Sequence, residues 1–148
     1  MGLKILVVFC FFNGFAFSQT LDQYRQNLSL AASNKSVCKS MLLLLEKKNL
    51  NAINRAYLGT YQTIWANHVF GPIAKWNTFS TGKKNIEQAV LMDADAVEIR
   101  ALRYAVQKNA PKFLGYYSSL SADKAYILER KHTLADLGLL QLVKSLNL

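Results

Sequence analysis

Apolar residues recur at steps of three and four along most of the chain, which is the spacing of one face of an α-helix. The clearest instance is the stretch 79–109, where two such patterns meet at a polar corner, Asp93-Ala94-Asp95. The positions before the corner are Phe79, Gly82, Ile86, Ala89 and Val90, and those after it are Ile99, Leu102 and Val106. The stretch therefore predicts two amphipathic helices that fold back on each other as a hairpin.

Capping residues predict the two ends of the second helix. Asp95 is a good N-cap, and Glu98 stands three residues later, where a capping box places an acidic residue. The sequence Asn109-Ala110-Pro111 ends the helix, because proline has no N–H to donate and restricts the residue before it.

The same periodicity predicts the rest of the chain. Helices are expected at Thr20–Ala32 with Thr20 as N-cap, Lys35–Lys48 with Asn34 as cap, Asn49–Val69 as the longest, Ile73–Phe79, Ser121–Lys131 and from Thr133 onward. A short irregular link is expected at Phe113–Tyr117, and whether the helix from Ile73 continues through residues 80–82 stays open. No useful length alternates with period two. We therefore predict an all-α fold of about seven helices packed as antiparallel hairpins.

The first 18 residues have the order of a secretory signal peptide. Lys4 provides a positive start, residues 5–12 form a short apolar core, and small residues precede a cleavage point after Ser18. A membrane anchor and a buried first helix are the alternatives. The apolar run is shorter than the roughly 20 residues that span a bilayer. We expect export to the periplasm or beyond, a single helical domain at 19–148, and no transmembrane segment after cleavage.

The corner also resembles the junction between helix hairpins in tetratricopeptide repeats. Ala89–Ala96 is similar to the end of such a repeat, Gly82, Ile86 and Ala89 match its small, bulky and small positions, and Leu58-Gly59 matches its first-helix pair. Ala94 stands where the repeat usually has proline. The resemblance implies a short bundle or solenoid fragment of hairpins. The whole chain also resembles short, signal-bearing helical proteins of Bacteroidetes-type bacteria, which implies no activity.

Residues suited to catalysis or to metal binding are few and scattered. His68 and His132 have no second histidine or cysteine at a metal-ligand spacing. After signal cleavage Cys38 is the one cysteine left, either a buried inert thiol or a reactive one. No phosphate-binding glycine loop and no Gly-x-Ser-x-Gly motif is present. We therefore expect no enzymatic activity, no catalytic residues, no cofactor and no metal.

Basic residues outnumber acidic ones, and the formal net charge is +9. They occur as separate pairs, among them Lys83-Lys84 and the pair Arg100 and Arg103, one helical turn apart. Each pair is either a solvated helix face or part of an anion-binding groove. We take Arg100, Arg103, Lys83 and Lys84 as candidate partner-binding residues. The aromatic residues Trp65, Trp76, Tyr116 and Tyr117 either line a peptide groove or fill the core.

The sequence thus favours an exported, non-enzymatic helical protein that binds a protein or peptide, because stacked hairpins present a concave face. The alternative is a basic protein that associates with anionic lipid or polysaccharide at the cell envelope. Nucleic acid is not an expected partner, since an exported protein rarely meets the genome.

Overall fold

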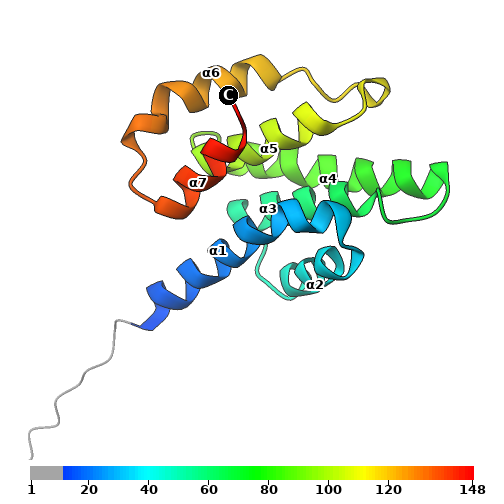
Figure 1. Ribbon diagram of the computed structural model, residues 1–148, viewed down its shortest axis with the longest axis horizontal. Coiled ribbons are helices and arrows are strands. Elements are labelled where there is room, and N and C mark those ends of the chain that lie inside the picture. Colours follow the sequence, from blue (N-terminus) through cyan, green and yellow to red (C-terminus); the bar gives the residue numbers. More distant parts are fainter. Residues whose placement is uncertain (1–11) are drawn as a thin grey trace, which may run out of the picture.

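The computed structural model describes residues 12–148, with side chains described from residue 20 on, and this part of the chain is all-α with no strand (Figure 1). The helices are α1 (Phe12–Ser33), α2 (Lys35–Glu46), α3 (Ala52–Trp65), α4 (Pro72–Met92), α5 (Val97–Asn109), α6 (Leu120–Arg130) and α7 (Leu137–Ser145). Two short 3₁₀ turns, η1 (Lys112–Leu114) and η2 (Lys131–Thr133), follow α5 and α6. The predicted fold class is confirmed.

Several predicted helix ends are confirmed and others are wrong. Asn34 caps α2, because its side chain accepts a hydrogen bond from the N–H of Val37 at 3.2 Å. Gly71 precedes α4 with φ +88°, a positive value that glycine adopts without strain. By contrast, α1 runs through Thr20 without a break, so Thr20 is not an N-cap. The helix α3 ends at Trp65 and has 14 residues, so it is shorter than α1 and α4, which have 22 and 21.

The capping box predicted at Asp95 and Glu98 is also wrong. The helix α5 begins at Val97, its N-cap is Ala96, and no side chain caps it. Glu98 is buried instead and accepts hydrogen bonds from Arg25 and Tyr57. Glu98, which the local pattern assigned to a helix cap, therefore forms a long-range ion pair with Arg25.

The helices α3 and α4 form an antiparallel hairpin, and α4 is continuous through residues 80–82. Its register can be read from polar contacts along the hairpin. Arg55, near the start of α3, donates to Gln88 at 2.8 Å, whereas Gln62, about two turns later, accepts from Asn85 at 2.7 Å. The first turns of α4 project beyond α3, and residues 72–77 are all exposed (Figure 1).

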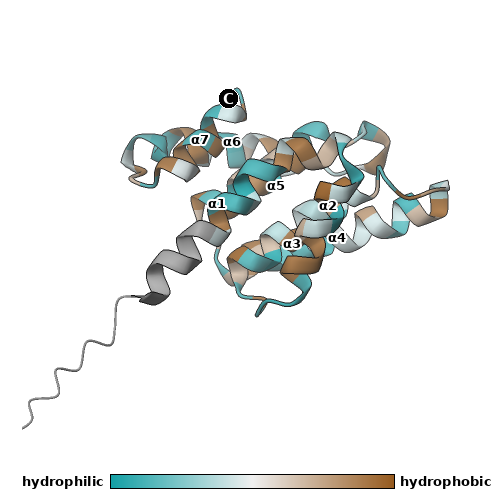
Figure 2. Cartoon of the chain, turned by 60° about the horizontal axis from the view of Figure 1, so that its bottom comes forward, coloured by the Kyte–Doolittle hydropathy of each residue, from teal (hydrophilic) through white to brown (hydrophobic). Residues whose placement is uncertain are grey.

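Two apolar clusters hold the helices together. The larger one contains Tyr24, Tyr57 and Tyr61 and joins all seven described helices, α1 to α7. The smaller one contains Phe79 and Ile86 of α4 with Val106 of α5 and Tyr116. Hydrophobic residues also remain on the surface near the projecting start of α4 (Figure 2).

The predicted signal peptide covers residues 1–18, and residues 1–11 lie outside the described part of the chain. None of the helices in residues 12–148 is both long and apolar enough to cross a bilayer.

Candidate functional site

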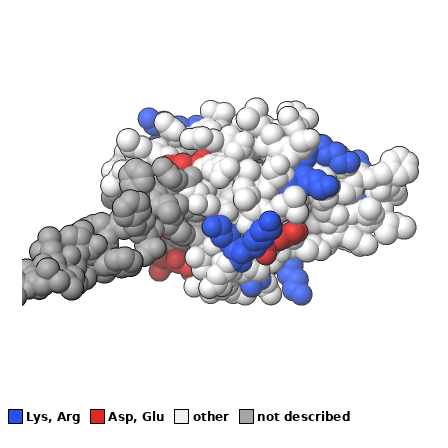
Figure 3. All heavy atoms as spheres, turned by 90° about the horizontal axis from the view of Figure 1, so that it is seen from below, with Lys and Arg blue, Asp and Glu red and all other residues white. Residues whose placement is uncertain are grey.

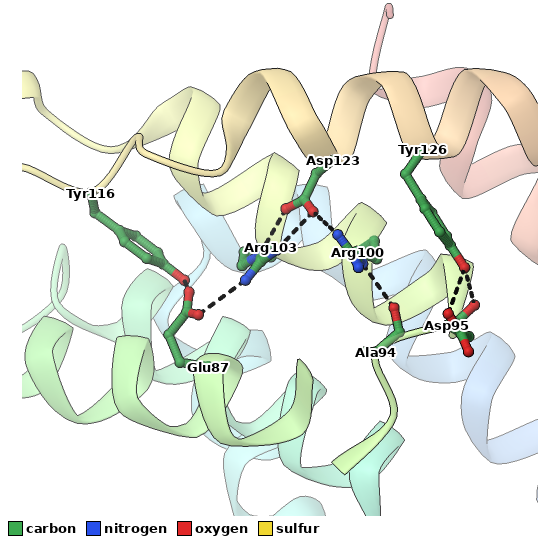
Figure 4. Close-up of polar contacts among 8 residues, drawn as sticks. All are labelled: Glu87, Ala94, Asp95, Arg100, Arg103, Tyr116, Asp123 and Tyr126. Atoms are coloured by element: carbon green, nitrogen blue, oxygen red, sulfur yellow. Dashed lines mark hydrogen bonds and ion pairs between the residues drawn. The ribbon is translucent and has the colours of Figure 1, made fainter. Parts of the chain in front are cut away.

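Arg103, a candidate partner-binding residue, is buried against a carboxylate of α6. Its Nε donates to Oδ2 of Asp123 at 2.7 Å and its second terminal nitrogen to Oδ1 at 2.8 Å (Figure 4). The Asp123 side chain is 0% exposed and that of Arg103 8%. Hydrogen bonds to Asp123 raise the pKa of Arg103 although burial opposes the shift, so the guanidinium stays charged. This bidentate pair fastens α6 to α5.

Arg100 is engaged on the same side of α5. It donates to Oδ1 of Asp123 at 3.1 Å and to the Ala94 carbonyl at 2.9 Å (Figure 4). Its guanidinium also lies 4.5 Å from the ring centre of Tyr126, and that of Arg130 lies 3.7 Å from the same centre. We expected both α5 arginines to be partly free, but the structure places them in contacts within the chain.

Lys83 and Lys84 differ from each other. Helical spacing allows an ion pair between Lys83 and Glu87, but Glu87 has other partners. It accepts from Arg103 at 3.0 Å and from the Tyr116 hydroxyl at 2.6 Å (Figure 4). Lys83 lies over the Tyr116 ring, 5.0 Å from its centre, and Lys84 is exposed. The four candidate residues therefore do not form one open basic surface.

A second buried cluster, which the sequence did not reveal, surrounds Arg25 of α1. Arg25 makes a bidentate contact with Glu98 at 2.8 and 2.7 Å and also contacts Asp22 at 2.7 Å and Asp136 at 3.0 Å. The Tyr57 hydroxyl donates to Glu98 at 2.5 Å. Burial lowers the pKa of Arg25, but hydrogen bonds to Glu98 and the other carboxylates outweigh it and raise the pKa overall. The cluster joins α1, α3, α5 and the start of α7.

The helices surround an open, mostly apolar groove of about 920 Å³. Its walls come from α1, the end of α3, the start of α4, the end of α5, η1 and α7. We call it the apolar groove. Its floor includes Phe79, Val106 and Leu142, and its lining also includes Ile73, Trp76 and Phe113.

The rim of the apolar groove exposes large hydrophobic side chains. Ile73 is 76% exposed, Trp76 52% and Phe113 84%. Phe70, two residues before α4 and outside the lining, is 99% exposed. Scattered single apolar residues are ordinary on protein surfaces, but residues that gather around a concave apolar floor mark a binding site. Of the predicted groove aromatics, Trp76 lines the groove, whereas Tyr116 is buried in the smaller apolar cluster.

The polar side chains in this lining are largely occupied by their own helices. Thr60 donates to the Ala56 carbonyl, Thr63 to that of Thr60, Ser145 to that of Leu142 and Asn109 to that of Ala105, at 2.6–2.9 Å. The groove consequently offers an occupant apolar contact and few hydrogen-bond donors.

The charge in the lining of the apolar groove has one sign. Lys75 is the charged residue of its lining. Neither of the two long segments that build most of its walls, residues 47–86 and 99–122, contains Asp or Glu. On the face that Figure 3 shows, basic side chains form separate groups over the surface. The groove is therefore an apolar site in a basic setting.

A smaller polar hollow of about 440 Å³ continues the apolar groove between α1 and α7. The two share Leu28, Ser29, Leu142 and Ser145. The polar hollow reaches Asp22 and Arg25 of the second buried cluster. Together the two hollows follow α7 from Leu137 to Leu146, about 14 Å at 1.5 Å per residue.

Neither histidine nor cysteine chemistry is assembled in the described residues. The ring of His68 hydrogen-bonds the Ala31 carbonyl at 2.7 Å. Cys38 is buried beside the Tyr61 carbonyl, and burial raises its pKa to about 11. Within residues 12–148 no group of three His, Cys, Asp or Glu side chains is placed to hold a metal ion.

Comparison with known proteins finds no matching family model, no matching curated protein and no matching solved structure. The apolar groove is therefore the basis for a proposed function.

Proposed function

We propose that this chain is an exported, non-enzymatic helical protein that binds a segment of another protein in the apolar groove. The observation that carries the proposal is the concave apolar floor with Ile73, Trp76 and Phe113 exposed around it. The chain resembles tetratricopeptide repeats in sequence, and stacked helical hairpins can bind peptides on a concave face.

The energetics favour an apolar occupant. Fully burying a side chain of the size of Ile or Phe contributes about 1.5–3 kcal/mol relative to leaving it exposed. Three such side chains at one site are enough anchors for a weak to moderate complex once association entropy is subtracted. In the unbound protein that area faces water.

A display selection tests the proposal directly. The protein is used to select from random peptides at 1 M salt, where the Debye length is about 3 Å and surface attraction is screened. We expect selected peptides to lose binding to Ile73→Ser and Phe113→Ser and to keep it for Leu91→Ser. Leu91 is 85% exposed on the same helix α4 but outside the groove, so it is a matched control. Peptides that bind all three variants equally would disprove the groove as the site.

The second candidate, association with anionic lipid or polysaccharide at the envelope, is favoured by the net charge of +9. Such association would differ from groove binding in its dependence on salt and on Ile73. Binding to vesicles that contain an anionic lipid would be strong at low salt, absent at 1 M salt and insensitive to Ile73→Ser.

Export is tested separately from binding. Mass spectrometry of the protein from the cells that make it should find Gln19 as the N-terminus, either free or cyclised. A full-length product in the cytoplasm would contradict export without bearing on the groove.

A further inference from the structure

We infer that the occupant of the apolar groove is an amphipathic helix of a partner protein that carries acidic residues beside its apolar stripe. This inference rests on the proposed function and specifies the class of partner. Three properties of the groove lead to it: the shortage of hydrogen-bonding groups in its lining, its width at the rim, and the sign of the charges around it.

The lining requires an occupant that satisfies its own backbone. An extended peptide leaves N–H and C=O groups that need partners, and each group buried without one weakens binding. Thr60, Thr63, Asn109 and Ser145 already donate to carbonyls of their own helices. The described part of the chain has no strand edge to pair with. A helix satisfies its backbone internally, as peptides do in other helix-in-groove complexes.

The rim requires an occupant wider than one hydrocarbon chain. A single acyl chain lying on Phe79 and Val106 would leave Ile73 and Phe113 largely in water, where they are 76% and 84% exposed. A helix is about 10–12 Å across with its side chains and covers floor and rim together.

The charges favour acidic residues on that helix. Lys75 lines the groove in the first turn of α4, and Lys108 and Lys112 are sequence neighbours of the lining residues Asn109 and Phe113. The partial charges at helix ends have the opposite effect to the lysines, because most of them are negative here. The C-termini of α1, α3, α5 and α7 and the N-terminus of α4 line the groove and together amount to about −1.5 charges, effective only over one turn.

The three lysines prevail because they carry three full charges against about −1.5. Lys108 also donates to the Leu146 carbonyl at 2.6 Å and so neutralises the end of α7. The same charges disfavour a second copy of this chain as the occupant. Its own exposed apolar segment, at the start of α4, contains Lys75 and no acidic residue, so like charges would meet across the pair.

Designed peptides test the inference, with the fluorescence of Trp76 as the reporter and Trp76→Phe as the blank. The reference probe is a helix of about 16 residues with leucines at steps of three and four and glutamates on its flanks. We expect it to bind, its lysine-flanked counterpart to bind at least about tenfold more weakly at low salt, and a version with a central proline to lose binding.

Charge variants of the protein complete the test. Lys75→Gln with Lys112→Gln should weaken binding of the glutamate probe about threefold to tenfold at low salt, as expected for losing two exposed ion pairs. Lys84→Gln, an exposed lysine of α4 outside the groove, should leave it unchanged. Equal binding of the proline version, equal binding of the lysine version, or an equal effect of Lys84→Gln overturns the inference.

The outcomes separate this inference from the proposed function. If the designed helices fail but display-selected peptides still depend on Ile73 and Phe113, the groove binds another kind of peptide and the acidic helix is wrong. Displacement of the probe by anionic vesicles alone, or concentration-dependent dimerisation that Phe113→Ser abolishes, overturns both. Loss of the probe with Phe113→Ser and retention with Leu91→Ser supports both.

Discussion

Gly59 of α3 and Gly82 of α4 face each other at the crossing of the two helices, so closely that neither position has room for a β-carbon. A Cβ placed on Gly59 would lie 2.6 Å from the Gly82 carbonyl oxygen, and one on Gly82 would lie 2.5 Å from that of Gly59. Both atoms in the way are backbone, which cannot rotate aside. The hairpin is therefore held at a distance that only paired glycines allow, and Ile86 packs beside them.

Either Gly59→Ala or Gly82→Ala should destabilise the protein by about 1–3 kcal/mol, because the helices have to separate. The sign of this stability change distinguishes a tight helix crossing from an ordinary helix interior. In an ordinary helix interior the same change stabilises by roughly 0.5–1 kcal/mol. Urea unfolding followed by circular dichroism measures the difference, and Ala74→Gly in the exposed start of α4 gives the ordinary propensity effect. A stabilised Gly82→Ala variant would show that the crossing is looser than described.

Arg103→Gln should cost about 3–5 kcal/mol, because it leaves the fully buried Asp123 without its bidentate partner. Arg100→Gln should cost less, since the Arg100 side chain is 20% exposed and makes one contact with the carboxylate. A double variant, Arg100→Gln with Arg103→Gln, loses both arginines that contact Asp123. The structure predicts that α6 detaches. Thermal melting of both single variants checks this, and an unchanged Arg103→Gln would mean that the carboxylate finds other partners.

The helices were predictable because their signals are local. The stripe through Ile86 and Ala89 and the glycine before Pro72 depend only on near neighbours in sequence. The residue pairs that fix the tertiary structure were not predictable, since Arg25 and Glu98 lie 73 positions apart. Local rules assigned Glu98 to a cap, and burial of Arg25 required it elsewhere.

In the candidate site, too, local features were predictable and long-range contacts were not. Charge spacing predicted an open pair at Arg100 and Arg103, but spacing on one helix does not show what the next helix places opposite, here Asp123 of α6. The groove needs six elements to meet, so no single stretch encodes it. Its one sequence signal was aromatic residues beside chain breaks, such as Phe113 after Pro111 and Phe70 before Gly71.

Asp136 should make the attachment of α7 sensitive to acid. The backbone N–H of Leu139 lowers the pKa of Asp136 below its usual 3.8, and Arg25 adds to this although burial opposes it. A lowered folded-state pKa means that the carboxylate stabilises the protein above pH 3.8 and that this contribution is lost as the pH falls through the folded-state value. Asp136→Ala should therefore cost about 0.5–2 kcal/mol at neutral pH.

The difference between Asp136→Ala and the unchanged protein should narrow below pH 3.8 in urea titrations. Asp93→Ala, at an exposed carboxylate after α4, controls for the general effect of removing a negative charge. A constant difference across the acid range would assign the loss to packing rather than to the ionised carboxylate.

Tyr24 and Tyr61 form a matched pair, because both are 0% exposed but their hydroxyls differ. The Tyr61 hydroxyl donates to the Tyr24 carbonyl at 2.6 Å, whereas that of Tyr24 has no hydrogen-bond partner within the part of the chain that the structure describes. Tyr61→Phe should cost about 0.5–1.5 kcal/mol, the net value of one buried hydrogen bond. Tyr24→Phe should be neutral or stabilising, since it removes a buried hydroxyl that has lost its water. Urea unfolding of the two variants under identical conditions measures both, and a loss of more than about 1 kcal/mol in Tyr24→Phe would show that this hydroxyl has a partner in solution.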